Sequence, residues 1–476
     1  MATLIAEAPP PTRPFEPDPG RPEPDVWPQT SRPMPWLLAV FMFMVYMIPF
    51  DSTLLPIKLP FNSGLDRMVL IVIGIVWLAV SVTGTRRPRF CHTPINLMMY
   101  LFVALSCLSL IINLRDLVWD RELSLGFKQM LLAFTYLLFF YMASSSIRRE
   151  DVRNFCKLLV FLGVASALGT ILEYRSHTNI FADLAHLIPG AKVHAKSAVG
   201  IHHATYARRS VGGPTKHGLA DATMLDAALP FAIAFMTRAT KAADKFWWGL
   251  AAIVLIAGCV ATQEKTAFIL LVVSLAVIVA YRPRRYARLW PLLIVAIILT
   301  RIAAPHSISA LKYQFTALGS SNSTSGRTAD YSAVAPFLNS HLLFGRGFGS
   351  YDPHKYRILD DQMLGFLIEI GAFGLLAYTG MIMAPVYATL RRARRGLTID
   401  DDLLAGISAG CVAFFVSNFL YDSFDFRQGP YVFFFLAALA AAAVGRRGSQ
   451  AVAPEAAPAT ARPPGQQNGA APVGVT

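Results

Sequence analysis

The sequence predicts an all-α polytopic integral membrane protein with about twelve transmembrane helices. Hydrophobic residues fill 54% of the 476 positions and charged residues only 15%, whereas soluble domains carry about 25% charged residues. Apolar runs of roughly 20 residues, the length that crosses a bilayer, recur along the chain. Lys and Arg gather in the short connections between these runs. So little charge could not cover the surface of a water-soluble fold of this length.

The two ends of the chain lack such runs. Residues 1–33 are rich in Pro with scattered charges and lack the apolar core of a cleavable signal peptide. Residues 446–476 consist largely of Ala, Pro, Gly and Gln, a composition without helical periodicity. We therefore expect two disordered cytoplasmic tails that flank one membrane domain, residues 34–445.

Between the tails, twelve apolar runs are long enough, or nearly so, to span about 30 Å of hydrocarbon. Their approximate limits are residues 34–50, 66–83, 95–112, 127–145, 155–172, 218–237, 246–262, 265–281, 287–303, 362–390, 403–420 and 429–445. We expect each run to form one transmembrane helix.

The distribution of Lys and Arg predicts the orientation of these helices. Alternate short loops carry clusters of basic residues, at about 86–89, 148–157, 238–245, 282–288 and 391–395. The short loops between them hold fewer, namely Lys58, Arg67, Arg115, Arg121, Lys128, Lys265 and Arg427. Because cytoplasmic loops carry the excess of Lys and Arg, both termini are predicted to be cytoplasmic.

This topology places two long connections, about 173–217 and 304–361, on the extracytoplasmic face. Long loops often carry function, so these two connections are where we look for a site. The formal net charge of +14 is spread over loop clusters and not along one stripe, which argues against a nucleic-acid partner. The five cysteines lie in or beside apolar runs, which excludes a disulfide framework or zinc site. We predict neither a metal nor another cofactor.

The first long connection ends in a basic, glycine-containing stretch from Arg208 and Arg209 to His217. Guanidinium groups beside glycines can bind phosphate oxygens bidentately while the backbone approaches closely. A lipid-borne diphosphate would suit such a stretch at a membrane edge. The alternative is simple contact of the basic side chains with lipid headgroups.

The second long connection contains two polar islands. One runs from Ser325 through Arg327 to Tyr331, and the other places Arg346 between glycines at alternate positions. Such glycines permit tight turns and close approach of the backbone to a ligand. The aromatic side chains nearby suit either stacking on sugar rings or anchoring at the membrane interface.

Asp360 and Asp361 precede the tenth apolar run, and Glu369 lies about two helical turns further on. Paired carboxylates near a low-dielectric region resist joint ionisation, and one of them could act as a general base. The alternative is an N-cap, in which Asp accepts hydrogen bonds from free backbone N–H groups; one residue could do both. Glu369 shares nearly the same helix face, so a continuous polar track is possible.

These features together resemble the bacterial O-antigen ligase and Wzy-type polysaccharide polymerase superfamily. The similarity rests on the span layout, on Arg327 in the last large outer loop, on the stretch Leu-Leu-Phe-Gly-Arg-Gly-Phe-Gly, and on Asp-Asp-Gln-Met-Leu followed by Glu-Ile-Gly-Ala-Phe-Gly. It covers about residues 172–444. The resemblance implies a GT-C-like helical fold.

The family's motifs map onto this chain with one departure. An Arg followed four residues later by Gly corresponds to Arg209 and Gly213, or to Arg208 and Gly212. A second essential Arg corresponds to Arg327. In the family, ten residues separate a His from a Gly; counting back from Gly371 in this way reaches Asp360, so Asp replaces the His, and Asp361 takes the place of the usual Asn. This departure favours a polymerase, or transfer to an acceptor other than lipid A core.

The resemblance implies an inverting, metal-independent glycosyltransferase of the bacterial cytoplasmic membrane, active on its outer face. Its partners would be a donor glycan on undecaprenyl diphosphate, a glycan or lipid acceptor, and the membrane lipids. Arg209 and Arg327 would neutralise the leaving diphosphate, and Asp360 or Asp361 would activate the acceptor. Arg208, His217, Tyr331, Arg346 and Glu369 are the candidate substrate-binding residues.

A transporter or lipid-linked glycan flippase is the alternative from another class. Such proteins usually contain internal repeats and discontinuous helices that meet near the middle of the membrane. The long connections follow the fifth and ninth runs, which breaks the symmetry of two six-helix halves. The sequence therefore favours the transferase.

Overall fold

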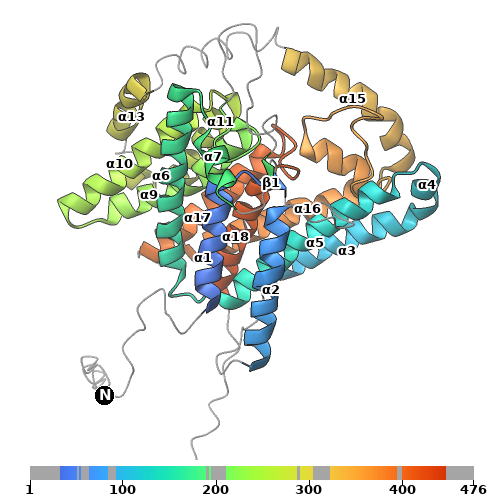
Figure 1. Cartoon of the computed structure of the whole chain (residues 1–476), viewed down its shortest axis with the longest axis horizontal. Helices are drawn as coiled ribbons and strands as arrows, with labels where there is room; N and C mark the ends of the chain where they lie inside the picture. Colours follow the sequence, from blue (N-terminus) through green and yellow to red (C-terminus); the bar gives the residue numbers. More distant parts are fainter. Residues whose placement is uncertain are drawn as a thin grey trace, which may run out of the picture.

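The computed structural model describes residues 33–50, 53–54, 64–83, 93–188, 192–193, 211–286, 290–303, 322–393 and 399–445. The two predicted tails, apart from residue 33, and the stretch that contains Arg208 and Arg209 lie outside these residues. Within them, almost every element is a helix (Figure 1).

The helices follow the apolar runs closely. In chain order they are α1 (Pro33–Met47), α2 (Leu65–Thr83), α3 (Pro94–Ile112), α4 (Leu114–Trp119), α5 (Leu123–Ser146), α6 (Val152–Ser176), α7 (Ile180–His186), α9 (Gly218–Arg238), α10 (Ala242–Ala261), α11 (Lys265–Tyr281), α12 (Pro283–Tyr286), α13 (Trp290–Ala303), α15 (Asn322–His341), α16 (Gln362–Ala393), α17 (Ile399–Ser417) and α18 (Gln428–Val444). Two short strands, β1 (Thr53–Leu54) and β2 (Lys192–Val193), pair antiparallel.

Each of the twelve predicted runs overlaps one helix. Within the described residues, seven helices are long and apolar enough to cross a membrane, namely α2, α3, α5, α6, α9, α10 and α16. The apolar helices α1, α11 and α18 are shorter, α13 has 14 residues, and α17 begins with three Asp residues in its first turn. The chain is therefore a polytopic helical membrane protein, and the count of twelve spans stays a prediction.

Central helices are distinguished from lipid-facing ones by burial. α9 and α18 are buried on nearly all sides, and α18 lies in the middle of the bundle (Figure 1). By contrast, Ile75 and Val82 of α2 are 62% and 73% exposed, and Ile111 of α3 is 67% exposed. Exposed apolar faces of this extent are expected where helices meet lipid.

The buried Asp402 forms ion pairs with arginines at the end of α9 and in the segment after α11. The carboxylate of Asp402, at the start of α17, is fully buried and lies 2.5 Å from Arg238 Nε and 3.1 Å from Arg285 Nη1. Arg282 Nε lies 3.5 Å from its other oxygen. These arginines belong to two of the basic loops that predicted the orientation.

Helix α16 is broken at Gly371, where φ is +67° and ψ is −172°. A turn formed by residues 342–347 fills the break. The N–H of Ala372 donates to the carbonyl of Leu342 at 2.8 Å. In return, the N–H groups of Arg346 and Gly347 donate to the carbonyls of Ile368 and Glu369, both at 2.9 Å. The alternating glycines thus allow a close backbone approach, but to α16, whereas the sequence led us to expect an approach to a ligand.

The two long connections contain regular structure of their own. The first includes α7 and β2, and the second includes α15. The polar island from Ser325 to Tyr331 therefore lies on a helix. This helix was not predicted because it carries few apolar residues and has no apolar stripe.

Candidate functional site

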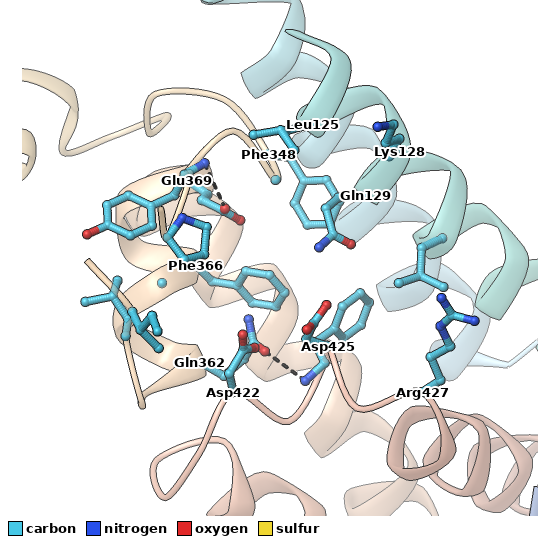
Figure 2. A pocket seen from close by; sticks show the side chains of 18 of the residues that line it. Leu125, Lys128, Gln129, Phe348, Gln362, Phe366, Glu369, Asp422, Asp425 and Arg427 are labelled. Atoms are coloured by element: carbon cyan, nitrogen blue, oxygen red, sulfur yellow. Dashed lines mark hydrogen bonds between the residues drawn. The ribbon is translucent and has the colours of Figure 1, made fainter. Parts of the chain in front are cut away.

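A cavity of about 460 Å³ is lined by residues near the beginnings of five helices, and Figure 2 shows the residues of α5, of α16 and of the turn before α18 that face it. Residues in or beside the first turns of α2, α5, α9, α16 and α18 line it. Helix N-termini carry a partial positive charge, so they favour anions. Aromatic side chains, among them Phe348, Phe366 and Phe424, form much of the apolar lining.

The cationic residues that line the cavity are Arg67, Lys128, Lys216 and Arg427. Arg427 is held in place, because its Nη1 lies 3.0 Å from Oδ1 of the buried Asp66. Tyr431 donates to the other oxygen of Asp66 at 2.9 Å. Lys128 and Lys216 are exposed at the rim. The helix ends and these side chains together make this side of the cavity suitable for a phosphate-bearing ligand.

The acidic residues that line the same cavity are Asp361, Glu369, Asp422 and Asp425. In Figure 2, Glu369 and Asp422 lie to the left of Lys128 and Arg427. The cavity is therefore polarised, with a cationic part beside an acidic part. A ligand that combines an anionic group with sugar hydroxyls matches this arrangement, because carboxylates accept hydrogen bonds from hydroxyls.

Asp361 has two functions in this geometry. Its Oδ1 accepts from the N–H groups of Met363 at 2.9 Å and Leu364 at 3.1 Å, which is the capping interaction that the sequence offered as an alternative. Its side chain also lines the cavity. Asp360, by contrast, is exposed and is not among the residues that line the cavity.

Glu369 reaches the same cavity from further along α16. Its Oε1 accepts from the N–H of Tyr351 at 3.3 Å, and its carbonyl accepts from Ser109 Oγ at 2.8 Å. Of the three carboxylates that the sequence placed on nearly one helix face, Asp361 and Glu369 line the cavity and Asp360 does not.

Asp422 lies in the turn between α17 and α18. Burial, and then the negative charge of Asp425, raise its pKa well above the ordinary value for Asp. Its carboxylate accepts from the backbone N–H of Asp425 (Figure 2). A carboxyl group that keeps its proton can donate a hydrogen bond to a ligand oxygen, which an ionised carboxylate cannot do.

Three of the predicted binding residues, His217, Tyr331 and Arg346, are not among the residues that line the cavity. Tyr331 is 60% exposed on α15. Arg346 is buried and pairs with Glu122, and its Nη2 lies 3.0 Å from Tyr356 Oη. Its guanidinium carbon lies 5.1 Å from the centre of the Phe337 ring. Arg346 thus holds protein segments together in this structure.

The segment before α9 shows why glycine follows the predicted phosphate-binding arginines. Gly213 has φ +59°. Its N–H donates to Glu173 Oε2 and its carbonyl accepts from Asn179 Nδ2, both at 2.9 Å. His217 caps α9, because its Nδ1 accepts from the N–H of Leu219 at 3.4 Å. Its neighbour Lys216 reaches the cavity.

The three remaining arginine candidates cannot be related to the cavity by side-chain geometry. Arg208 and Arg209 lie outside the described residues, and Arg327 belongs to α15 with a side chain that the structure does not describe. Among the described residues, no group of three or more His, Cys, Asp and Glu side chains is arranged to hold a metal ion.

The sequence reasoning missed most of the cationic lining. Arg67, Lys128 and Arg427 were counted only as members of the sparse basic set in the outer short loops. The small number of basic residues in these loops was a usable signal, because a Lys or Arg in a loop that is otherwise poor in cations is a candidate for a specific function. Asp422 and Asp425 had no such signal, since they lie in a short turn between two apolar runs.

A family model described as O-Antigen ligase matches residues 250–379. The match confirms the resemblance to the O-antigen ligase and Wzy-type polymerase superfamily over these residues. They include part of the cavity lining, from Phe348 to Glu369. Comparison with curated proteins gave no match.

Proposed function

We propose that this chain, which carries an O-antigen ligase domain over residues 250–379, is a glycosyltransferase acting on glycans carried by undecaprenyl diphosphate. The observation that carries the proposal is the polarised cavity, with its cationic part beside the carboxylates of α16 and the 422–425 turn. In such a donor the diphosphate is bonded directly to a sugar, so the cationic part and the acidic part of its binding site must lie within a few ångströms of each other.

The donor diphosphate binds at the helix N-termini, between Arg67, Lys128, Lys216 and Arg427. As the bond between the anomeric carbon and the phosphate oxygen breaks, negative charge grows on the diphosphate, and preorganised cations stabilise it. Arg209 and Arg327 remain candidates for the same task, because Arg209 precedes Lys216 by seven residues in the sequence and α15, which carries Arg327, packs against α16.

The acceptor hydroxyl attacks the anomeric carbon from the face opposite the diphosphate, which inverts the configuration. Asp361 accepts the hydroxyl proton as the general base. Glu369, Asp422 and Asp425 hold sugar hydroxyls. Since the diphosphate departs as a stable anion, the step does not require a general acid.

The proposed topology is consistent with an active site on the outer face of the bacterial cytoplasmic membrane. With both termini cytoplasmic and twelve spans, α2, α5, α9, α16 and α18 all begin on the outer side. These are the helices whose beginnings converge at the cavity. A lipid-linked glycan that has been moved to the outer leaflet would meet the cavity there.

The break in α16 does not favour the transporter alternative. In transporters, the freed backbone groups of broken helices coordinate the substrate or ion. Here the groups on both sides of Gly371 are bonded to the turn of residues 342–347. The break therefore serves to join two parts of the protein.

The test is the size distribution of lipid-linked and surface glycan in a deletion strain that is complemented with wild type or with variants. Single repeat units that accumulate on the lipid support a polymerase, and long chains that remain on the lipid support a ligase. Pools that do not change on deletion contradict the proposal.

Lys128→Glu is the discriminating variant, because Lys128 is exposed and its replacement should not disturb packing. We expect the KM for the lipid-linked donor to rise roughly tenfold, which corresponds to about 1.4 kcal/mol. Arg115→Glu is the matched control, since Arg115 is an exposed cation of α4 that does not line the cavity. Equal effects of the two variants would argue against a donor site at Lys128.

A further inference from the structure

Glu122 is a buried carboxylate outside the cavity that gathers three donors. It precedes α5 and is only 2% exposed. Arg346 Nη2 binds one of its oxygens, and Lys355 Nζ and Tyr356 Oη each donate to the other at 2.8 Å. The hydrogen bond to Glu122, and then that to Tyr356, raise the pKa of Lys355. A buried carboxylate with this many donors fixes the position of all three partners.

Arg346 is the partner whose backbone contacts α16. Its guanidinium carbon lies 4.7 Å from the centre of the Tyr356 ring and 5.1 Å from that of Phe337. The two ring centres lie only 5.2 Å apart, so the guanidinium rests against both rings, and Glu122 binds its Nη2. The backbone N–H of Arg346 donates to the carbonyl of Ile368 in the first half of α16.

The residues after Arg346 connect its fixed position to Glu369 through two hydrogen bonds from backbone N–H groups. The N–H of Gly347 donates to the Glu369 carbonyl at 2.9 Å. The N–H of Tyr351 donates to Glu369 Oε1 at 3.3 Å. From the other side, Asn113 Nδ2 donates to the carbonyl of Gly345 at 2.9 Å. One short segment thus connects the buried ion pair at Glu122 with an acidic group of the cavity.

We propose that Glu122 is a positioning residue for the reaction: through Arg346 and the turn of residues 345–351, it fixes the carboxylate of Glu369 in the cavity. This inference rests on the proposed function, in which Glu369 holds a hydroxyl of the sugar substrate. Without the negative charge of Glu122, Arg346 keeps a buried charge with one strong partner fewer, and the turn loses its anchor. Glu369 then loses its fixed donor at Tyr351.

The experiment uses the full chain in proteoliposomes, with the lipid-linked glycan extracted from the deletion strain as substrate. Glu122→Gln should lower kcat roughly 10- to 100-fold, the range expected when a reacting group is misplaced by about 1 Å. The KM for the donor should change less than about twofold, because the cationic part of the cavity is untouched. Glu122→Asp keeps the charge and should recover part of the loss.

Glu369→Gln combined with Glu122→Gln separates positioning from general destabilisation. If Glu122 acts through Glu369, the double variant should be no slower than Glu369→Gln alone, because interacting residues are non-additive. Losses that multiply in the double variant would overturn the proposal. So would a Glu122→Gln variant with the kcat of wild type.

Asp402→Asn is the matched control for a buried, arginine-bound carboxylate. Asp402 pairs with Arg238, the last residue of α9. α9 begins beside the cavity and has 21 residues, so its last residue and Asp402 lie about 30 Å from the cavity. Asp402→Asn should lower the melting temperature at least as much as Glu122→Gln and leave kcat unchanged. A similar drop in kcat in both variants would overturn the positioning role. A wild-type protein that is inactive on this glycan would contradict the proposed function, and the inference with it.

Discussion

Replacing Asp361 by Asn separates the two functions that the geometry gives this residue. Oδ1 of Asp361 caps α16 through the N–H groups of Met363 and Leu364 at 2.9 and 3.1 Å. Asn is as good an N-cap as Asp, so this contribution survives the substitution. The lost attraction between the carboxylate and the helix dipole amounts to about 0.3–1 kcal/mol. Asp361→Asn should therefore melt within a few degrees of the wild type.

The chemical function should not survive. An amide cannot accept the proton of the acceptor hydroxyl, and the contribution of a positioned general base is typically about 10²- to 10⁴-fold. We expect kcat to fall by this factor while the KM for the donor stays nearly constant. Asp361→Ala should lose the same activity and about 1 kcal/mol more stability, because the cap is removed as well.

The assay is single-turnover transfer from the extracted lipid-linked glycan, with melting temperatures measured on the same preparations. Asp360→Asn provides the matched comparison, because Asp360 is exposed and does not line the cavity. Substitutions of this kind usually change free energies by less than about 0.5 kcal/mol. An active Asp361→Asn variant beside an inactive Asp360→Asn variant would refute the assignment and would favour the position that the family motif predicts.

Two further predictions concern stability. Because the pKa of Asp422 is raised in the folded state, the folded protein holds this proton at pH values where the unfolded chain has released it. The stabilising contribution of Asp422 to folding is therefore fully present below about pH 4 and is lost as the pH rises through the raised pKa. Asp422→Asn cannot ionise and should therefore lose less melting temperature than wild type between acidic and neutral pH; identical pH profiles would contradict this. Gly371→Ala should cost roughly 1–3 kcal/mol, since φ is +67° and an added Cβ would meet the carbonyl of Leu343. Gly365→Ala, which has open space around the added Cβ, serves as its control in the same thermal unfolding assay.

The helices could be predicted from the sequence because a long apolar run is a strong local signal. The run 218–237 corresponds to α9 (Gly218–Arg238), and the run 362–390 corresponds to α16 (Gln362–Ala393). α15 could not be found in this way, because its residues are largely polar and its helical state has no apolar periodicity to reveal it.

The sequence could predict that two site residues lie close together when they are near each other along one helix. It could not predict pairs that only the tertiary fold brings together. Asp361 and Glu369 are eight residues apart, so the helical period alone places them on one face. The partner of Arg346 is Glu122, 224 residues away in the sequence, and no local pattern indicates such a pair. Arg346 was therefore interpreted as a ligand contact because its glycine-rich neighbourhood was visible and its carboxylate was not.

The cavity also shows which part of the proposal depends on family membership and which depends on geometry. The matched region, residues 250–379, contains the first half of α16, the break at Gly371 and the turn that fills it. It therefore contains Asp361, Glu369 and the backbone that supports them. All four cations, Arg67, Lys128, Lys216 and Arg427, lie outside this region. Apart from Arg327, which lies within the matched region, the donor half of the mechanism thus rests on the convergence of helix N-termini and on these four cations. Substitution of these cations is consequently the sharper test, because its outcome does not follow from the family match.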